Sequence, residues 1–325
     1  MRKEDTVKGL TICGLTLFVL AGLAHPPAAQ AWGCKGHQTV ALIAEKQLTP
    51  EAKQVVQALL EGNPIDPALK RYCGEAVHDA MADASTWPDD IRGTAKNGPW
   101  HYIDIPRGAK RAPLAEFCGK EGCVTKAIED ELAILKNKNA DPAKRAEALR
   151  YIIHFVGDLH QPLHAITNDD QGGNCVPVNY FRRKARQHDH GYSPNLHGLW
   201  DTAIPERDME GADPAEYAET LGEIFAGQIE GWQKAGIHIE NWAWESHEYG
   251  ESTAYGELKP SIAIEAPMEV HGCADDNNIG DRLLRQHITA GAAYQEKAAP
   301  VVERRIAEAG VRLAMILNEA AKTAL

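Results

Sequence analysis

Two short segments of this sequence place a histidine and an aspartate four residues apart. HFVGDLHQPLH (154–164) contains His154 and Asp158, and NLHGLWD (195–201) contains His197 and Asp201. Side chains four residues apart on a helix point to the same side, so each pair could chelate one metal ion without bending the backbone. Imidazole nitrogens and carboxylate oxygens are ligands that zinc accepts. These pairs therefore suggest metal chemistry.

A single pair of this kind is weak evidence. With 14 histidines and 46 acidic residues in 325, chance alone gives roughly two pairs at this spacing. His247–Glu251 and His271–Asp275 have the same spacing without the same surroundings. The order of several fragments along the chain is more informative. They are Trp32 and His37, WPDDIR at 87–92, His101, and then the two pairs with His164 between them.

The elements that carry these residues are expected to be helices. EKQLTPEAKQVVQALLEG (45–62) has Thr49 as a helix N-cap, Pro50 at the first helical position and a closing Gly62. Strand signals are scarce, CVPVNYF being the best of them. The fold class expected is mainly α, with functional loops between helices. Further helical patterns cover 73–87, 124–137, 141–161, 213–235 and 279–320.

The first 31 residues have the layout of a secretory signal peptide. A charged start, MRKEDTVK, precedes the apolar run GLTICGLTLFVLAGLA and the small-residue triplet Ala29-Gln30-Ala31. The run is shorter than the roughly 20 residues that a spanning helix needs. We expect cleavage after Ala31, which leaves one domain over 32–325. The mature chain, secreted or periplasmic, would have no stable association with a membrane.

Six cysteines remain after that cleavage. An even number in an exported chain predicts disulfides, with fifteen possible pairings. Only Cys118–Cys123 is local enough to be proposed from the sequence. The cysteines show no C-x-x-C spacing, which argues against a cysteine zinc site.

The net charge of −12 limits how the protein could handle nucleic acid. Broad binding to a phosphate backbone is driven by Lys and Arg, so an acidic surface argues against it. Any activity on phosphates would need a local source of concentrated positive charge.

The ordered fragments resemble those of the S1/P1 nucleases, zinc-dependent secreted enzymes that prefer single strands and also act as 3′-nucleotidases. The resemblance covers essentially the whole mature chain, less clearly at QHDHGYSP and 236–275. It implies a single compact helical domain of the P1 nuclease / zinc phospholipase C type. It also implies a monomeric hydrolase that cleaves single-stranded DNA and RNA to 5′-phosphate products and accepts 3′-nucleotides. The fragments are WGCKGHQTV, WPDDIR, WHYIDI, HFVGDLHQPLH, GGN, NLHGLWD and the closing helix VVERRIAEAGVRLAMILN.

By the same resemblance, three Zn²⁺ ions form the metal centre. The N-terminal tryptophan of the mature family members binds through its free α-amino group and carbonyl oxygen, which explains why Trp32 directly follows the predicted cleavage site. Three ions and three aspartates leave a cationic pocket inside an acidic protein. The implied ligands are Asp89, His101, His154 and Asp158 for the first ion, His164, His197 and Asp201 for the second, and Trp32, His37 and a bridging Asp158 for the third.

The resemblance also implies roles in catalysis and recognition. Asp89 would orient or deprotonate the attacking water, and Arg92 would stabilise negative charge on the phosphoryl group. A tyrosine can stack on any unpaired base, which would account for a preference for single strands. The residues implied in base recognition are Tyr102, Asp104, Gly173 and Asn174.

Two other functions remain open from the sequence. A zinc phospholipase C uses a similar scaffold, but its final pair resembles His-x-x-x-Glu, where this chain has Asp201, together with the nuclease-like WHYID and GGN. A secreted zinc-binding protein without turnover is the other alternative. Such proteins usually carry flexible histidine-rich tracts, whereas these candidate ligands are dispersed over separate predicted elements.

Overall fold

The computed structural model describes residues 32–74, 79–188, 191–265, 273 and 279–324. The predicted signal peptide, residues 1–31, and the His271–Asp275 pair, which has the same spacing as the candidate ligands, lie outside the described residues. The described chain is mainly helical, as expected. Its longer helices are α1 (Cys34–Lys46), α2 (Pro50–Gly62), α3 (Ala80–Asp90), α5 (Val124–Lys136), α6 (Pro142–His160), α9 (Pro214–Ile224), α10 (Ala226–Ala235), α11 (Ile239–Tyr249), α12 (Ile279–Gln286) and α13 (Ala292–Ala324).

Shorter elements connect these helices. Several of them are single turns, and two are π-helical. The short helices are α4 (Arg92–Ala95), η1 (Gly98–His101), η2 (Leu114–Glu116), η3 (Pro162–His164), α7 (Leu196–Gly198), the π-helix η4 (Leu199–Ala203), α8 (Ile204–Asp208) and the π-helix η5 (Gly250–Tyr255). The strands are β1 (Asn179–Tyr180), paired in parallel with β4 (Thr289–Ala290), and β2 (Arg186–His188), antiparallel to β3 (Gly191–Ser193).

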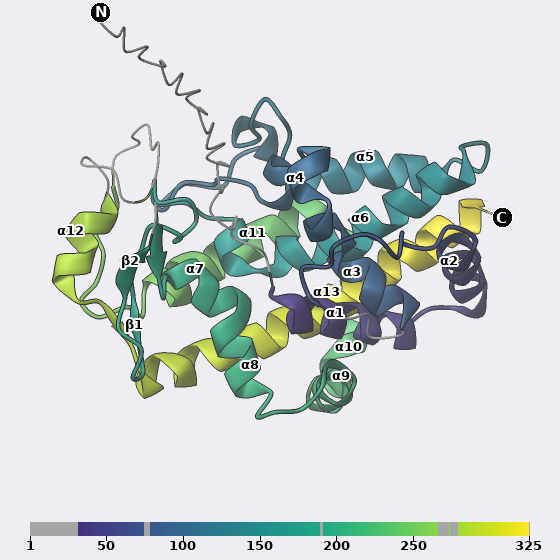
Figure 1. The fold of residues 1–325 in the computed structure, drawn as a ribbon. Helices are drawn as coiled ribbons and strands as arrows, with labels where there is room; N and C mark the ends of the chain where they lie inside the picture. Colours follow the sequence, from purple (N-terminus) through teal and green to yellow (C-terminus); the bar gives the residue numbers. More distant parts are fainter. Residues whose placement is uncertain (1–31, 75–78, 189–190, 266–272, 274–278, 325) are drawn as a thin grey trace, which may run out of the picture.

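Helix α13 runs along much of the molecule and packs against α1, α2, α6 and α10 (Figure 1). Helix α6 is the other central element, because it packs against α3, α5 and α13 and is buried on all sides from Ala148 to His160. A helix that is buried all round must place its polar side chains against partners. His154, Asp158 and His160 are the polar residues that α6 buries in its last two turns.

The sequence patterns agree with several helices in detail. Thr49 caps α2, with its hydroxyl accepting a hydrogen bond from the Ala52 amide at 3.2 Å, and Asp141 caps α6 through the Ala143 amide at 2.7 Å. Both caps precede a proline at the first helical position, as the sequence indicates.

Other boundaries differ from the patterns. The helix expected over 73–87 begins at Ala80, where Asp79 caps it, and the pattern over 213–235 forms two helices that meet at Phe225. The pattern over 279–320 breaks between α12 and α13 because His287 takes a positive φ of 51° and the next residues pair with β1. In CVPVNYF only Asn179–Tyr180 forms a strand. Helices α1 and α11 were not predicted.

Candidate metal centre

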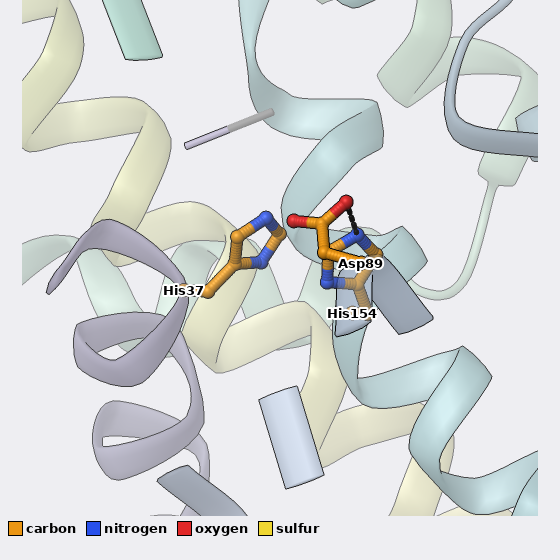
Figure 2. A group of neighbouring side chains, drawn as sticks. All are labelled: His37, Asp89 and His154. Carbon is orange, nitrogen blue, oxygen red and sulfur yellow. Dashed lines mark ion pairs between the residues drawn. The ribbon is translucent and has the colours of Figure 1, made fainter. Parts of the chain in front are cut away.

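Five histidines and three aspartates, carried by seven elements, converge beside the C-terminal half of α6. His37 comes from the first turn of α1 and Asp89 from the last turn of α3 (Figure 2). Every one of these side chains is at least nine-tenths buried. The others are His101 at the end of η1, His154 and Asp158 on α6, His164 at the end of η3, His197 on α7 and Asp201 on η4.

The first group surrounds Asp158. Its Oδ2 lies 3.0 Å from His101 Nδ1 and 3.3 Å from His154 Nε2, and Asp89 Oδ1 lies 3.7 and 3.8 Å from the same two nitrogens. A tetrahedral zinc ion with ligands at about 2.0–2.2 Å separates neighbouring ligand atoms by about 3.4 Å. These distances fit one ion among the four side chains.

His37 approaches the same carboxylate from the other side. Its Nε2 lies 3.2 Å from Asp158 Oδ1, and its ring stacks on His154 with centroids 4.0 Å apart. The close approach depends on Gly157, where an added Cβ would lie 2.9 Å from His37 Nδ1 and 3.8 Å from the Trp32 ring. Trp32 is completely buried beside His37. Asp158 can therefore face two cations, one through each oxygen.

The second group consists of His164, His197 and Asp201. His197 Nε2 lies 3.1 Å from His164 Nε2 and 3.4 Å from Asp201 Oδ2, separations that again fit a tetrahedral ion. Asp201 sits in the π-helix η4, which continues from the short α7. Single π-helical turns of this kind occur often at functional sites. The wider turn still brings the two side chains to one side of the helix.

Backbone carbonyl groups fix the orientation of three of the histidines. The Nδ1 atoms of His154, His164 and His197 each lie 2.6 Å from a carbonyl oxygen, of Ser85, His101 and Gly172 respectively. A neutral ring that donates its Nδ1 proton in this way keeps a lone pair on Nε2. All three lone pairs then face the carboxylates. Ligand histidines in metal sites are oriented by this kind of contact.

Many polar atoms of the centre have no hydrogen-bond partner within the described chain. They include both ring nitrogens of His37, Asp89 Oδ1, His101 Nε2 and both carboxylate oxygens of Asp158. Leaving a buried donor or acceptor unpaired costs about 1–3 kcal/mol each, and more for charged groups. Those that face one another across the centre, His37 Nε2, Asp89 Oδ1 and the two oxygens of Asp158, are therefore atoms that a cation would complete.

Burial and the neighbouring charges shift the pKa values of the histidines and aspartates in the centre. Burial lowers the pKa of His37 to about 4 and the pKa values of His101 and His197 to about 3, so these rings are neutral at pH 7, as metal ligands must be. Burial raises the pKa of Asp89 to about 6 and that of Asp201 well above its usual range. Burial opposes a charge on His154, but Asp158 and Asp89 raise its pKa to about 9. Bound cations would displace the proton on His154 and on Asp201, and would keep Asp89 ionised below its pKa of about 6.

A cavity of about 230 Å³ opens onto the second group. Of the residues implied in recognition, Tyr102, Asp104 and Asn174 line it, and Arg92 lines it as well. Gly173 does not: its amide donates to Asp170 Oδ1 at 2.9 Å, and the neighbouring Gly172 forms the wall instead. The complete lining is Arg92, Tyr102, Asp104, Leu163, His164, Gln171, Gly172, Asn174 and His197.

The sequence reasoning missed two residues that support the ligands. Gln161 donates from Nε2 to Asp201 Oδ1 at 2.6 Å, and its Oε1 accepts from the Leu163 amide in the turn that carries His164. Gly172, at a positive φ of 59°, supplies the carbonyl that orients His197. The position of Gln161 inside HFVGDLHQPLH was the available signal.

Three disulfides join loops of the described chain. Cys118–Cys123 is the pair proposed from the sequence, and it is confirmed. The others are Cys34–Cys73, which ties the start of α1 to the loop before α3, and Cys175–Cys273. No helix among the described residues is long and apolar enough to span a bilayer.

Comparison with known proteins gives one family over nearly the whole described chain. The S1/P1 Nuclease family matches residues 32–322, beginning at Trp32. Nuclease S1 of Aspergillus oryzae is 27% identical to this chain over 92% of it and 94% of the nuclease. Nuclease P1 of Penicillium citrinum is 28% identical over 89% of this chain and 97% of its own length. Endonuclease 2 of Arabidopsis thaliana is 28% identical over 96% of this chain and 97% of its own length.

Proposed function

The chain belongs to the S1/P1 nuclease family, and from this premise we propose that it hydrolyses phosphodiester bonds of single-stranded DNA and RNA, leaving 5′-phosphate products, and also acts as a 3′-nucleotidase. The observation that supports this most directly is the convergence of oriented histidine lone pairs and buried carboxylates beside a cavity that Arg92 and Tyr102 line. Such a centre concentrates positive charge in a protein whose net charge is −12.

We propose three zinc positions at the centre. Asp89, His101, His154 and Asp158 would hold one ion, and His164, His197 and Asp201 a second. The third would lie between His37, Asp158 and the main chain of Trp32. Together the ions would lower the pKa of a water molecule toward neutrality and offset charge on the phosphoryl group. The ligand separations and the unpaired polar atoms support this assignment.

The third position depends on the N-terminus of the mature protein. We propose that residues 1–31 are removed on export to the periplasm or medium, so that Trp32 carries a free α-amino group. An amide nitrogen has no available lone pair, whereas an amine does once it loses its proton. The three disulfides support an oxidising compartment. Zinc analysis of protein starting at Trp32, beside protein with one extra N-terminal residue, tests this: equal zinc content would remove Trp32 from the site.

Two residues of the chain would act on the scissile phosphate. Asp89 has a pKa of about 6 in the absence of cations, and as a carboxylate it would orient the attacking water and accept its proton. Arg92 lies three residues further on, in the wall of the cavity, where its guanidinium group would stabilise charge that develops on the phosphoryl oxygens.

The cavity would receive the base on the 5′ side of the scissile bond. Tyr102 would stack on that base, and Asp104 and Asn174 would contact its edge. Gly173 would act indirectly, by holding the loop 170–174. Stacking requires an unpaired base, so this arrangement favours single strands. The protein would work as a monomer.

Assays of the zinc-loaded mature protein test the function. We expect cleavage of single-stranded DNA and RNA faster than duplex DNA, release of phosphate from a 3′-nucleotide but not a 5′-nucleotide, and no hydrolysis of lecithin. Arg92→Ala should keep its zinc while turnover falls about 10²–10³-fold, because a group that faces the developing charge is lost. Lecithin hydrolysis without nuclease activity would instead identify a phospholipase C. Zinc binding without turnover on any of these substrates would identify a metal-binding protein.

A further inference from the structure

Tyr72 exposes an aromatic ring beside the metal centre. It is 57% exposed, and among the described residues the other large apolar side chains exposed to this degree are isoleucines. A single exposed apolar side chain is ordinary on a protein surface. Tyr72 differs from such residues because several contacts hold its backbone in place while its ring is exposed to solvent.

Three contacts hold the segment 71–73 against the elements that carry the metal centre. The Tyr72 amide donates to Asp90 Oδ1 at 2.6 Å, and Arg71 Nε lies 2.7 Å from Asp90 Oδ2. The Asp90 side chain is fully buried, and it follows Asp89 directly. On the other side of Tyr72, Cys73 is bonded to Cys34 at the start of α1. None of these contacts uses the tyrosine ring.

The same contacts bring the ring near two of the candidate ligands. Cys34 follows Gly33, whose amide donates to the Asp201 carbonyl at 2.5 Å, so the disulfide places Tyr72 close to Asp201 as well as to Asp89. The electrostatics agree: partial burial and then the charges of Asp89 and Asp201 raise the pKa of the Tyr72 hydroxyl.

Tyr72 and Tyr102 therefore lie at separate places around one metal centre. Tyr102 lines the cavity that opens onto His164 and His197, and Tyr72 is not among the lining residues of that cavity. A phosphodiester has one nucleoside on each side of the phosphorus, whereas a 3′-nucleotide has only the nucleoside on the 5′ side. If Tyr102 receives the base on the 5′ side, the base on the 3′ side needs another surface.

We propose that Tyr72 is the stacking surface for the nucleobase on the 3′ side of the scissile phosphate. The inference rests on the proposed nuclease function and extends it to a second base site. A base presents a flat face whatever its identity, so the contact would be tolerant of sequence. A ring whose backbone is already fixed by Asp90 and by the disulfide loses little freedom on binding a base.

The test compares two substrates on one variant. We expect Tyr72→Ala to lower kcat/KM for a dinucleoside monophosphate by roughly 5- to 100-fold, mainly through KM, as loss of one stacked base should. Phosphate release from the corresponding 3′-nucleotide should stay within about twofold of wild type, because that substrate has no second base. Tyr72→Phe keeps the stacking face and should restore the dinucleotide activity. Ile224→Ala, which removes another exposed side chain far along the chain on α9, should change neither activity.

Each other outcome overturns the proposal. If Tyr72→Ala cleaves both substrates like wild type, the ring is an ordinary surface residue. If both activities fall together and zinc content falls with them, Tyr72 maintains the metal centre rather than binding a base. If Tyr72→Phe is as impaired as Tyr72→Ala on the dinucleotide, the hydroxyl group and not stacking is responsible. Failure of the nuclease function itself would be visible beforehand, because wild type would then cleave neither substrate.

Discussion

Helix α6 buries polar side chains on two sides, and the two sets differ in how completely they are hydrogen-bonded. On one side, His154 and Asp158 face the candidate metal centre, where both oxygens of Asp158 have no hydrogen-bond partner within the described chain. On the other side, His160 faces α11 and α13. Its Nδ1 donates to the Val156 carbonyl at 2.8 Å, and its Nε2 accepts from Arg312 at 3.0 Å.

The side around His160 is fully paired. Arg305 is completely buried, and its five N–H groups meet five acceptors. These acceptors are the carbonyl oxygens of His160 and Trp242, Glu245 Oε2, Ser246 Oγ and Glu308 Oε2. Burial and the charges of Arg305 and Arg312 push the pKa of His160 well below its usual value, so the ring stays neutral. This side needs no additional ligand.

The difference separates a structural role from a ligand-binding role for histidines in one short segment. His154, His160 and His164 are all buried and all belong to HFVGDLHQPLH. In all three rings Nδ1 contacts a backbone carbonyl, but Nε2 of His160 accepts from Arg312, whereas Nε2 of His154 and of His164 faces the ring of another candidate ligand at 3.0 and 3.1 Å. Buried polar groups in folded proteins are normally paired, so the unpaired set on the opposite side is the one that a cation would complete.

The largest effect should follow from a change on the unpaired side. Asp158→Asn removes the carboxylate that faces two of the proposed zinc positions. We expect zinc content to fall from three ions to one and nuclease activity to fall at least about 10³-fold, because the lost ions contribute several kcal/mol of charge stabilisation. Metal analysis and a single-strand cleavage assay measure both.

The matched control for that variant is Asp130→Asn. Asp130 forms an exposed ion pair with Lys126 on α5, with 59% of each side chain accessible, and exposed pairs contribute little. Neither zinc content nor activity should change in it. Full zinc content in Asp158→Asn would show that the Asp158 oxygens have no role in metal binding. The assignment of metal binding to one side of α6 and of a structural role to the other would then be wrong.

A change on the paired side should affect stability instead. Arg305→Met removes the partner of Glu308 Oε2, while Arg304 stays on Oε1, and it leaves the buried carbonyl groups of His160 and Trp242 without this donor, so we expect the free energy of unfolding to fall by about 3–5 kcal/mol. Urea denaturation measures this. The folded variant should still bind three zinc ions and cleave single strands. Arg305→Met/Glu308→Leu removes both buried charges and should recover part of the loss, because the one cation that loses its carboxylate, Arg304, is 39% exposed. Loss of zinc from folded Arg305→Met would contradict the division of roles.

The sequence could predict the helices and the candidate ligands, but not which buried histidine is structural. The caps at Thr49 and Asp141 and the spacing of His154 and Asp158 are local features, and local features can be read along the chain. The residue that occupies Nε2 of His160 is Arg312 on α13, 152 residues further on, so no local pattern reveals it.

Contacts between distant parts of the chain also explain the other features that the sequence did not predict. Helix α1 was not predicted, because its first turn is buried by packing against α3 and α13 and is rich in Gly and polar residues that give no helical periodicity. Tyr72 carries no signal in the sequence at all, since its position near the metal centre results from the Cys34–Cys73 bond, one of fifteen possible pairings. The sequence also could not show that Gly172 lies in the cavity wall and its neighbour Gly173 does not, because both have a positive φ and their placement depends on the contacts of the loop 170–174.

Gln161 follows the last residue of α6, between its two sides, and its substitution is expected to have the smallest effect of the three. It is fully buried, and like His160 it uses both of its polar side-chain atoms in hydrogen bonds, but its Nε2 contacts Asp201 on the metal side. Gln161→Leu removes this donor and the acceptor for the Leu163 amide. We expect zinc affinity at the second position alone to fall about 10–100-fold, as loss of a group that orients a ligand does.

Zinc titration monitored by activity should separate this effect from the two larger ones. In Gln161→Leu, excess zinc should restore cleavage, because the ligands themselves remain, whereas in Asp158→Asn it should not. Gln161→Glu keeps the acceptor for Leu163 but places a second carboxylate 2.6 Å from Asp201, so it should need at least as much zinc as Gln161→Leu. Unchanged zinc affinity in both variants would mean that the hydrogen bond to Asp201 only fills the core, and Gln161 would then belong with His160 and Arg305.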